Sequence, residues 1–153
     1  MGYKLGTVDG KAVLIKENSY YDIATLSNGA IGSDSVEALK FQSKLSELFE
    51  SLDEKNATGN LSDVELGNPV PNSPNCYAVG LNYRKHAEES GMDIPEVPMI
   101  FTKHTSCFVG PKANVEMRSD YVDWEVELVA VIGKDGKNIP KENALDHVAG
   151  LCV

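Results

Sequence analysis

The first hydrophobic pattern in the chain is a pair of short segments that surround Asp9-Gly10. Residues 3–8 (YKLGTV) and residues 11–16 (KAVLIK) both carry the apolar content of short strands. An Asp-Gly pair tolerates the positive φ angles that a tight hairpin turn demands. The pattern therefore predicts a β-hairpin, and residues 20–26 (YYDIATL) continue in the same style.

The spacing of apolar residues is different in residues 34–53 from that in the strands before them. Apolar residues now recur at helical spacing, at Val36, Leu39, Leu45, Leu48, Phe49 and Leu52. This spacing predicts an amphipathic helix, with Ser33, Asp34 or Ser35 as its N-cap.

A polar segment and a proline-rich segment separate two parts of the chain. Residues 53–63 are rich in polar side chains and predict a loop, and residues 64–74 contain three prolines and predict an extended crossing. We therefore divide the chain into a small N-terminal α+β module at residues 1–65 and a strand-rich part at residues 66–153.

The second part begins with a predicted strand, a short helix and another strand. The strands are expected around Ala78 and Phe101, and the helix between Tyr83 and Gly91. Asn82 is a plausible N-cap of that helix and Gly91 a plausible stop. Residues 140–149 suit a further helix, with Pro140 near its first turn.

An acidic pattern marks residues 121–133. Asp123, Glu125 and Glu127 alternate with Trp124, Val126 and Leu128, and an apolar run follows. In a strand, residues two apart share a face, so the three carboxylates would lie about 7 Å apart. Because like charges at this spacing repel, we expect a cation nearby.

Composition and charge exclude several classes of function. The net charge of −9 argues against nucleic acid and anionic membranes as partners, and no apolar run is long enough to span a bilayer. The three cysteines, Cys76, Cys107 and Cys152, are far apart, which favours a reducing compartment, and we expect a cytoplasmic protein.

The Glu125-Glu127 pair has two interpretations. Two carboxylates at i and i+2 can both reach one hard divalent cation, and the lack of soft ligands favours Mg²⁺ or Mn²⁺ over Zn²⁺. An ordinary solvent-exposed strand face would give the same alternation. A metal site needs a third ligand, either Asp123 or a residue beyond Val153.

His86 and Glu89 lie three residues apart in the predicted short helix and so share a face. A carboxylate beside an imidazole raises its basicity, and such a pair can act as a general base on water. The alternative is a solvated surface helix. Because the helix has little apolar surface, it has the character of a mobile lid.

Lys103 follows the apolar segment PMIFT. A lysine at a strand end can bind the carboxylate of an anionic substrate, and the alternative is a surface lysine without a specific role.

Four segments together resemble the fumarylacetoacetate hydrolase family. They are YAVGLNYRKHAEESG, PEVPMIFTKHTSCFVGP, VDWEVELVAVIGK and ENALDHVAGLCV, in the order and at the separations usual for the family. The resemblance covers about residues 66–153. It implies an α+β fold in which a small N-terminal module precedes the first half of a mixed β-sandwich roll.

The resemblance also implies roles for the residues already singled out. Glu125 and Glu127 match the Glu-x-Glu pair that binds Mg²⁺ or Mn²⁺, and His86 with Glu89 matches the water-activating dyad. Lys103 matches a lysine near the bound 2-oxo acid. The family's third metal ligand, an aspartate, would lie beyond Val153.

The implied activity is metal-dependent hydrolysis of a carbon–carbon bond in a small 2,4-dioxo acid of the acylpyruvate or fumarylpyruvate type. Two other activities of the family stay open: oxaloacetate decarboxylation or tautomerisation, and isomerisation of 2-hydroxyhepta-2,4-diene-1,7-dioate. The full-length protein is expected to form a homodimer.

Because residues 147–153 (HVAGLCV) break off inside an apolar run, we expect the chain to be a fragment of a longer protein. As a fragment it would be poorly stable and inactive alone, since an incomplete sheet leaves open edges. A non-catalytic chain that at most pairs with another subunit is therefore the third hypothesis.

Overall fold

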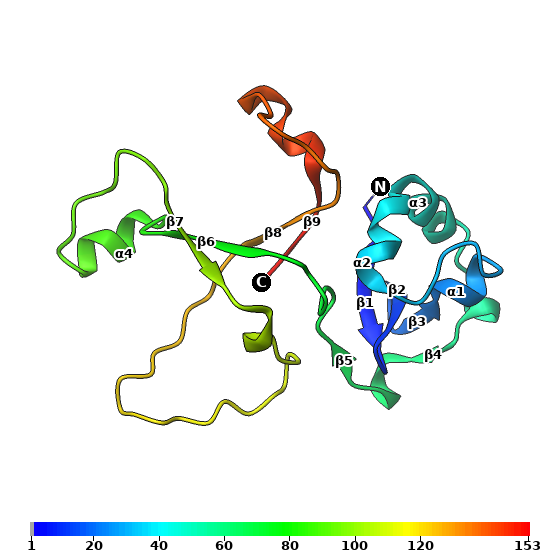
Figure 1. Cartoon of the computed structure of the whole chain (residues 1–153). Helices are drawn as coiled ribbons and strands as arrows, with labels where there is room; N and C mark the ends of the chain where they lie inside the picture. The colour runs from blue at the N-terminus through cyan, green and yellow to red at the C-terminus, as the bar shows by residue number, and fades with distance from the viewer. Residues whose placement is uncertain (1) are drawn as a thin grey trace.

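The computed structural model describes residues 2–153 and shows a mixed α+β fold. The N-terminal module, whose sheet includes Leu66–Gly67, lies on one side of the molecule, and the second part, whose first strand begins at Cys76, extends away from it (Figure 1). This architecture confirms the predicted α+β class.

An antiparallel sheet of five strands forms the base of the N-terminal module. Its order is β4-β3-β2-β1-β5, with every neighbouring pair antiparallel. The strands are β1 (Lys4–Val8), β2 (Lys11–Lys16), β3 (Ser19–Asp22), β4 (Gly59–Asn60) and β5 (Leu66–Gly67).

The predicted hairpin at Asp9-Gly10 is confirmed. Val8 pairs with Lys11, so the loop contains two residues, and both have positive φ, 49° at Asp9 and 74° at Gly10. These angles are those of a type I′ turn, whose twist matches the right-handed twist of the strands.

The helices of the module are shorter than the sequence predicts. They are α1 (Ile23–Leu26), α2 (Ser35–Ala38), a 3₁₀ turn (Leu39–Phe41) and α3 (Gln42–Glu50). The prediction of one continuous helix over residues 34–53 is wrong. Leu39 and Leu45 are six positions apart, which puts them about 120° apart around a helix. With the 3₁₀ turn between them both side chains are buried, with 7% and 0% exposure.

Asp34 is the N-cap of α2, one of the three predicted candidates. Its side chain accepts a hydrogen bond from the Glu37 N–H at 2.9 Å. This bond stabilises the carboxylate and holds the pKa of Asp34 below its usual value.

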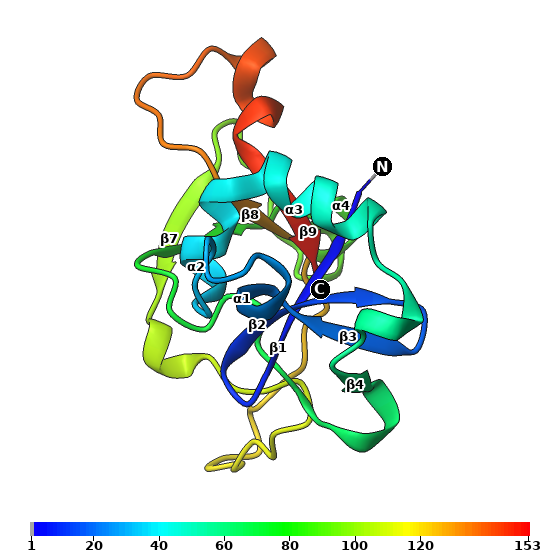
Figure 2. The ribbon, with the colours of Figure 1, turned by 90° about the vertical axis from the view of Figure 1, so that its right-hand side faces the viewer.

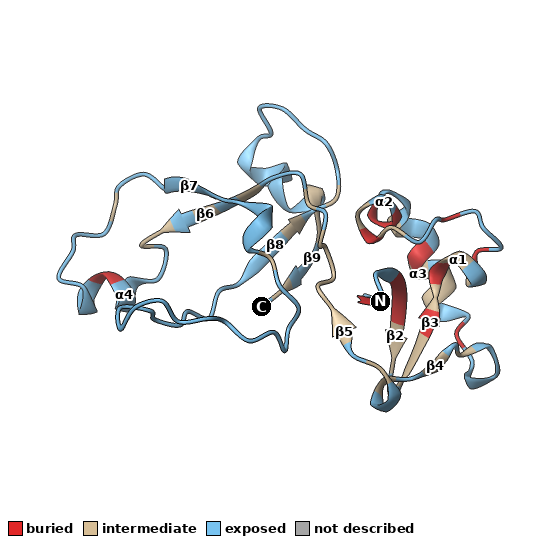
Figure 3. Ribbon diagram, turned by 60° about the horizontal axis from the view of Figure 1, so that its bottom comes forward, coloured by how far each residue is buried: buried red, intermediate tan, exposed pale blue. Residues whose placement is uncertain are grey.

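The hydrophobic core lies between this sheet and its helices. Helices α2 and α3 cover the sheet in Figure 2, and the buried residues gather in this module in Figure 3. The core cluster consists of Ala12, Leu14, Tyr21, Ile23, Ile31, Ala38, Leu45 and Leu52.

The second part is built from two separate two-stranded sheets and one helix. Strand β6 (Cys76–Gly80) pairs with β7 (Met99–Lys103), and β8 (Val129–Ile132) pairs with β9 (Val148–Cys152). Helix α4 (Arg84–Glu89) lies between β6 and β7 in sequence. The remaining elements of the chain are 3₁₀ turns at Glu54–Asn56, Leu61–Asp63, Thr105–Cys107 and Lys141–His147.

Little of this second part is buried. Among the described residues beyond Leu52, Ala87 alone falls in the buried class. Apolar side chains of β7 stay open, with Ile100 58% and Phe101 48% exposed. No helix within residues 2–153 has the length and apolar character to cross a bilayer.

Two sequence predictions for this part need correction. The acidic strand predicted over residues 121–133 is reduced to β8, and residues 122–128 have no partner strand among residues 2–153. The helix predicted over residues 140–149 is a 3₁₀ helix at Lys141–His147 followed directly by β9.

The β8–β9 hairpin lies against the N-terminal module. The Gln42 side chain donates to the Gly133 carbonyl at 3.4 Å. A Cβ atom at Gly133 would stand 2.5 Å from the Cβ of Ala149 in β9, so the close approach of the two strands of the hairpin requires glycine here, whereas the flexible end of the Gln42 side chain, 2.6 Å away, could move. A cavity of about 350 Å³ lies between the two parts. Its lining includes Tyr3 and Leu39 of the module and Ala149 and Cys152 of the hairpin.

We predict that a core truncation in the module destabilises the protein far more than a truncation in the second part. Leu14→Ala should lower the free energy of unfolding by about 2–5 kcal/mol, because Leu14 is fully buried. Val115→Ala, at a side chain that is 71% exposed, should change it by less than about 0.5 kcal/mol. Urea unfolding measures both, and equal effects would show that stability does not reside in this core.

Candidate functional site

Helix α4 carries two of the predicted site residues and has well-defined ends. Tyr83, in extended conformation, is its N-cap residue, so the prediction of Asn82 as the cap is wrong. At the C-terminal end, the Met92 N–H donates to the Ala87 carbonyl at 3.0 Å and the Gly91 N–H donates to the Glu88 carbonyl at 3.1 Å. This is a Schellman motif, and the φ of 64° at Gly91 confirms the predicted stop.

His86 and Glu89 both project from α4 into solvent. They are three residues apart on this helix, and both are exposed. Within residues 2–153 the two side chains do not hydrogen-bond each other, and His86 likewise makes no ion pair. The imidazole is therefore open to solvent.

The acidic segment at residues 122–128 is exposed along its whole length. Trp124 and Val126 are as open as the acids, with 82% and 67% exposure, so the segment has no buried face. One Asp123 oxygen accepts the Trp124 N–H at 2.8 Å. Glu125 and Glu127 form no ion pair with any residue from 2 to 153.

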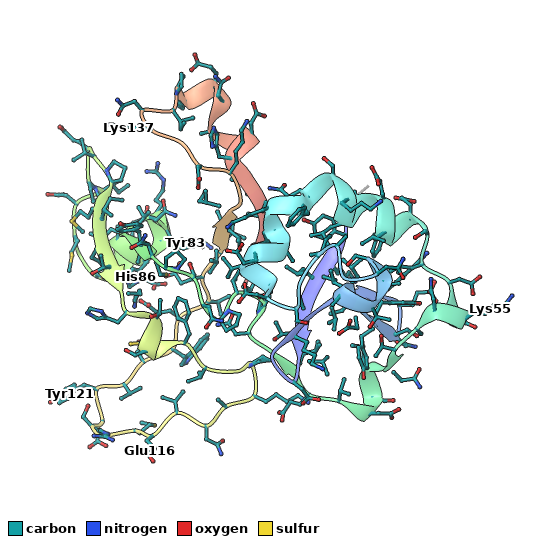
Figure 4. All side chains as sticks on the ribbon, turned by 45° about the vertical axis from the view of Figure 1, so that its right-hand side comes forward. Lys55, Tyr83, His86, Glu116, Tyr121 and Lys137 are labelled. Carbon is teal, nitrogen blue, oxygen red and sulfur yellow. The ribbon has the colours of Figure 1, made fainter. Side chains whose placement is uncertain are left out.

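One hydrogen bond connects the helix to the acidic segment. The Leu128 N–H donates to the Tyr83 hydroxyl at 3.1 Å, across 45 positions of sequence. Leu128 follows Glu127 directly, and Tyr83 is the cap residue of the helix that carries His86. The bond thus joins the start of the histidine-bearing helix to the residue that follows Glu127, and Tyr83 and His86 lie close together in Figure 4.

Lys103 lies at a different place in this part of the fold. In the β6–β7 register, Gly80 pairs with Met99 and Cys76 pairs with Lys103. Helix α4 follows the Gly80 end, so Lys103 lies four strand positions away, about 14 Å along the hairpin. Its ammonium group sits 5.5 Å from the centre of the Phe101 ring.

The donor set fits a hard divalent cation. Glu125 and Glu127 supply carboxylate oxygens without a protein cation beside them, and Mg²⁺ commonly takes few protein carboxylates and keeps several waters. No three His, Cys, Asp or Glu side chains gather as a metal site within residues 2–153. Within residues 2–153, Glu125 and Glu127 therefore have no third carboxylate, imidazole or thiol gathered with them as a metal site.

Sequence reasoning missed Tyr83 as a site residue. Its spacing from Ala87 indicates a packing role, and nothing in the local sequence relates it to Leu128. The large cavity is also away from the site: its lining includes Tyr3, Leu39 and Cys152, and none of the predicted site residues. Burial there raises the pKa of the Tyr3 phenol and of the Cys152 thiol.

Comparison with known proteins identifies relatives for both parts of the chain. Residues 75–153 match the family described as fumarylacetoacetate (FAA) hydrolase C-terminal. The mitochondrial oxaloacetate tautomerase fahd2 of Xenopus laevis is 43% identical over 94 residues, and human FAHD2A, which carries the same enzyme name, is 44% identical over 94 residues. Each alignment covers 60% of this chain and 30% of the relative.

A solved structure resembles nearly the whole chain. A candidate HpcE protein from Mycobacterium smegmatis superposes with a TM-score of 0.84 at 36% identity. The match covers 96% of this chain and 52% of the other. Both the N-terminal module and the second part therefore have counterparts in one solved chain.

We predict that Gly91→Ala loosens the C-terminal end of α4. An alanine at this left-handed position costs about 1 kcal/mol, which corresponds to roughly fivefold faster exchange of the Met92 amide. Gly110→Ala is the matched control, since Gly110 has no heavy atom within 4 Å of the added Cβ and no left-handed φ. NMR-detected hydrogen exchange measures both variants, and an unchanged Met92 rate in Gly91→Ala would contradict the motif.

Proposed function

Because the chain belongs to the fumarylacetoacetate hydrolase family, we propose that it forms part of an enzyme that interconverts the keto and enol forms of a small 2-oxo acid of the oxaloacetate type. The observation that carries this proposal is the coincidence of two features. Relatives that align with 60% of the chain are named oxaloacetate tautomerases, and a hydrogen bond from Leu128, next to Glu127, joins the acidic segment to the histidine-bearing helix.

We assign Glu125 and Glu127 as ligands of Mg²⁺ or Mn²⁺. When bound, the cation would supply Lewis-acid stabilisation of the oxygen charge that develops as a 2-oxo acid becomes an enolate. The role of the two glutamates is to hold that charge next to the helix. The local positive charge also offsets the chain's net charge of −9 for an anionic substrate.

His86 acts as the proton carrier in this proposal. In keto–enol interconversion, its neutral imidazole accepts the proton that leaves the carbon next to the keto group. The electron pair of that C–H bond becomes the enolate double bond, and the proton returns at the oxygen to give the enol. Glu89, one helical turn along, fixes the imidazole tautomer and raises its basicity once the pair closes.

Hydrolysis of a 2,4-dioxo acid is the second candidate. It is favoured by the exposure of His86, which leaves the imidazole in contact with bulk water. Here His86 takes a proton from water, the hydroxide adds to the 4-keto carbon, and the bond between carbons 3 and 4 breaks. The departing fragment is the same kind of enolate, so both reactions use the same groups.

Lys103 is proposed to bind a distal part of the substrate anion. Its position at the far end of the β6–β7 hairpin supports contact with a carboxylate rather than with the reacting carbon. Because its ammonium already lies near the Phe101 ring, the lysine is partly oriented before substrate arrives.

We predict that loss of the metal ligands abolishes activity in a complete protein that contains this chain, which is the protein used for every activity measurement below. Glu127→Gln should weaken Mn²⁺ binding by at least about tenfold, because a neutral amide replaces an ionised ligand. EDTA should have the same effect on the rate, and Mg²⁺ should restore it. Mn²⁺ affinity is measured by electron paramagnetic resonance. The reaction is followed by NMR, as deuterium uptake at carbon 3 of oxaloacetate and as cleavage of an acylpyruvate.

Asp123→Asn is the matched control for this experiment, since Asp123 already bonds its neighbour's N–H and should leave Mn²⁺ affinity unchanged. Equal Mn²⁺ affinity in the Glu127→Gln variant and the unmodified protein would refute the metal role. Cleavage without deuterium uptake into oxaloacetate would favour the hydrolase over the tautomerase.

We predict that His86→Ala separates proton transfer from metal binding. Loss of the general base should lower kcat by about 10²–10⁴-fold. Mn²⁺ affinity should stay nearly the same, because His86 is not one of the assigned ligands. His104→Ala is a suitable control, since His104 is a second exposed histidine that lies outside α4. Loss of Mn²⁺ binding in His86→Ala would show that the assigned roles are wrong.

A further inference from the structure

Tyr83 makes a hydrogen bond between the histidine-bearing helix and the acidic segment. Its hydroxyl accepts the Leu128 N–H at 3.1 Å, while its backbone carbonyl accepts the Ala87 N–H at 3.2 Å. The first of these bonds is made to the acidic segment and the second starts α4. A single residue therefore holds both elements.

The Leu128 N–H, which donates to the Tyr83 hydroxyl, has no partner in a neighbouring strand within residues 2–153. The β8–β9 ladder begins with Val129 opposite Cys152, so Leu128 lies just outside it. Its N–H is directed to the Tyr83 hydroxyl instead. The bond thus fixes the backbone at the point where the acidic segment enters β8, one residue from Glu127.

The backbone before Tyr83 is also unusual. Leu81 has a φ of 52°, a left-handed conformation that non-glycine residues adopt rarely. It ends β6 and turns the chain into α4 within three residues. Because left-handed leucine is strained, surrounding contacts must hold the turn in place, and the Tyr83 bond is one such contact.

We propose that Tyr83 is a positioning residue, whose hydroxyl sets the distance between the His86–Glu89 pair and the Glu125–Glu127 pair. This proposal rests on the proposed function of those two pairs. In the tautomerase reaction the proton leaves the carbon next to the keto group, and in the hydrolase reaction it leaves a water that attacks the 4-keto carbon, so in both the imidazole must lie at a set place relative to the substrate that the glutamate side would hold. Correct placement of the imidazole against that atom is worth orders of magnitude in rate.

The hydroxyl acts here as an acceptor from a backbone N–H, a role that phenylalanine cannot take. The aromatic ring itself is 43% exposed, so Tyr83→Phe removes the bond while it changes little of the packing. The variant therefore tests the bond rather than the fold of the second part. Tyr121→Phe is the matched control, because Tyr121 is 97% exposed and lies at the tip of the long loop (Figure 4).

The first measurement is amide hydrogen exchange by NMR, without metal or substrate. Tyr83→Phe should speed exchange of the Leu128 amide by a factor on the order of five to ten, and Tyr121→Phe should not. Amides of β2 in the N-terminal module serve as the internal reference for intact folding. An unchanged Leu128 rate in Tyr83→Phe would overturn the proposal.

The second measurement separates positioning from binding. Tyr83→Phe should lower kcat by about tenfold with KM and Mn²⁺ affinity unchanged, because the groups themselves remain present. Faster Leu128 exchange with unchanged kcat would overturn the positioning role, as would an equal loss of Mn²⁺ affinity. If His86→Ala retains full activity, the proposed function fails, whereas the Leu128 exchange rate still reports whether the bond exists.

Discussion

Leu14 lies in the middle of β2, fully buried, and shares one core cluster with Ala38 of α2 and Leu45 of α3. Burial of the sheet face that carries Leu14 is the constraint on which the rest of the structure depends. The described residues beyond Leu52 contribute a single buried side chain. Two-stranded sheets are marginal in water unless another layer covers them. The module therefore provides the stable body, and the β8–β9 hairpin is held against it through Gly133 and Gln42.

The sequence predicts local features of this fold well where local chemistry decides them. The Asp9-Gly10 hairpin, the Asp34 cap and the Gly91 stop follow from backbone angles and short-range hydrogen bonds, and all three are confirmed. The long helix failed because apolar spacing alone does not reveal the turn between Leu39 and Leu45. The acidic strand failed because alternation cannot show whether a partner strand exists.

For the site, spacing and family resemblance single out the residues but not their arrangement. The i, i+3 relation of His86 and Glu89 follows from the helix, whereas the proximity of that helix to Glu127 depends on a bond across 45 positions. Tyr83 and Leu128 have no local signature, so no pattern within either segment could predict the contact. The separation of Lys103 from α4 likewise follows from strand register, which the sequence does not reveal.

The close approach at Gly133 has a consequence for reading related sequences. The methyl group of Ala149 and the backbone of Gly133 meet with no room for a carbon between them. Ala149 belongs to β9 of the same hairpin, so a relative with a larger residue at this position has to change the path of the chain where β8 and β9 separate. The Gln42 amide, at the end of a flexible side chain, can move aside. This single position is therefore a marker, legible in any homologue, of how closely the two strands of the hairpin approach each other.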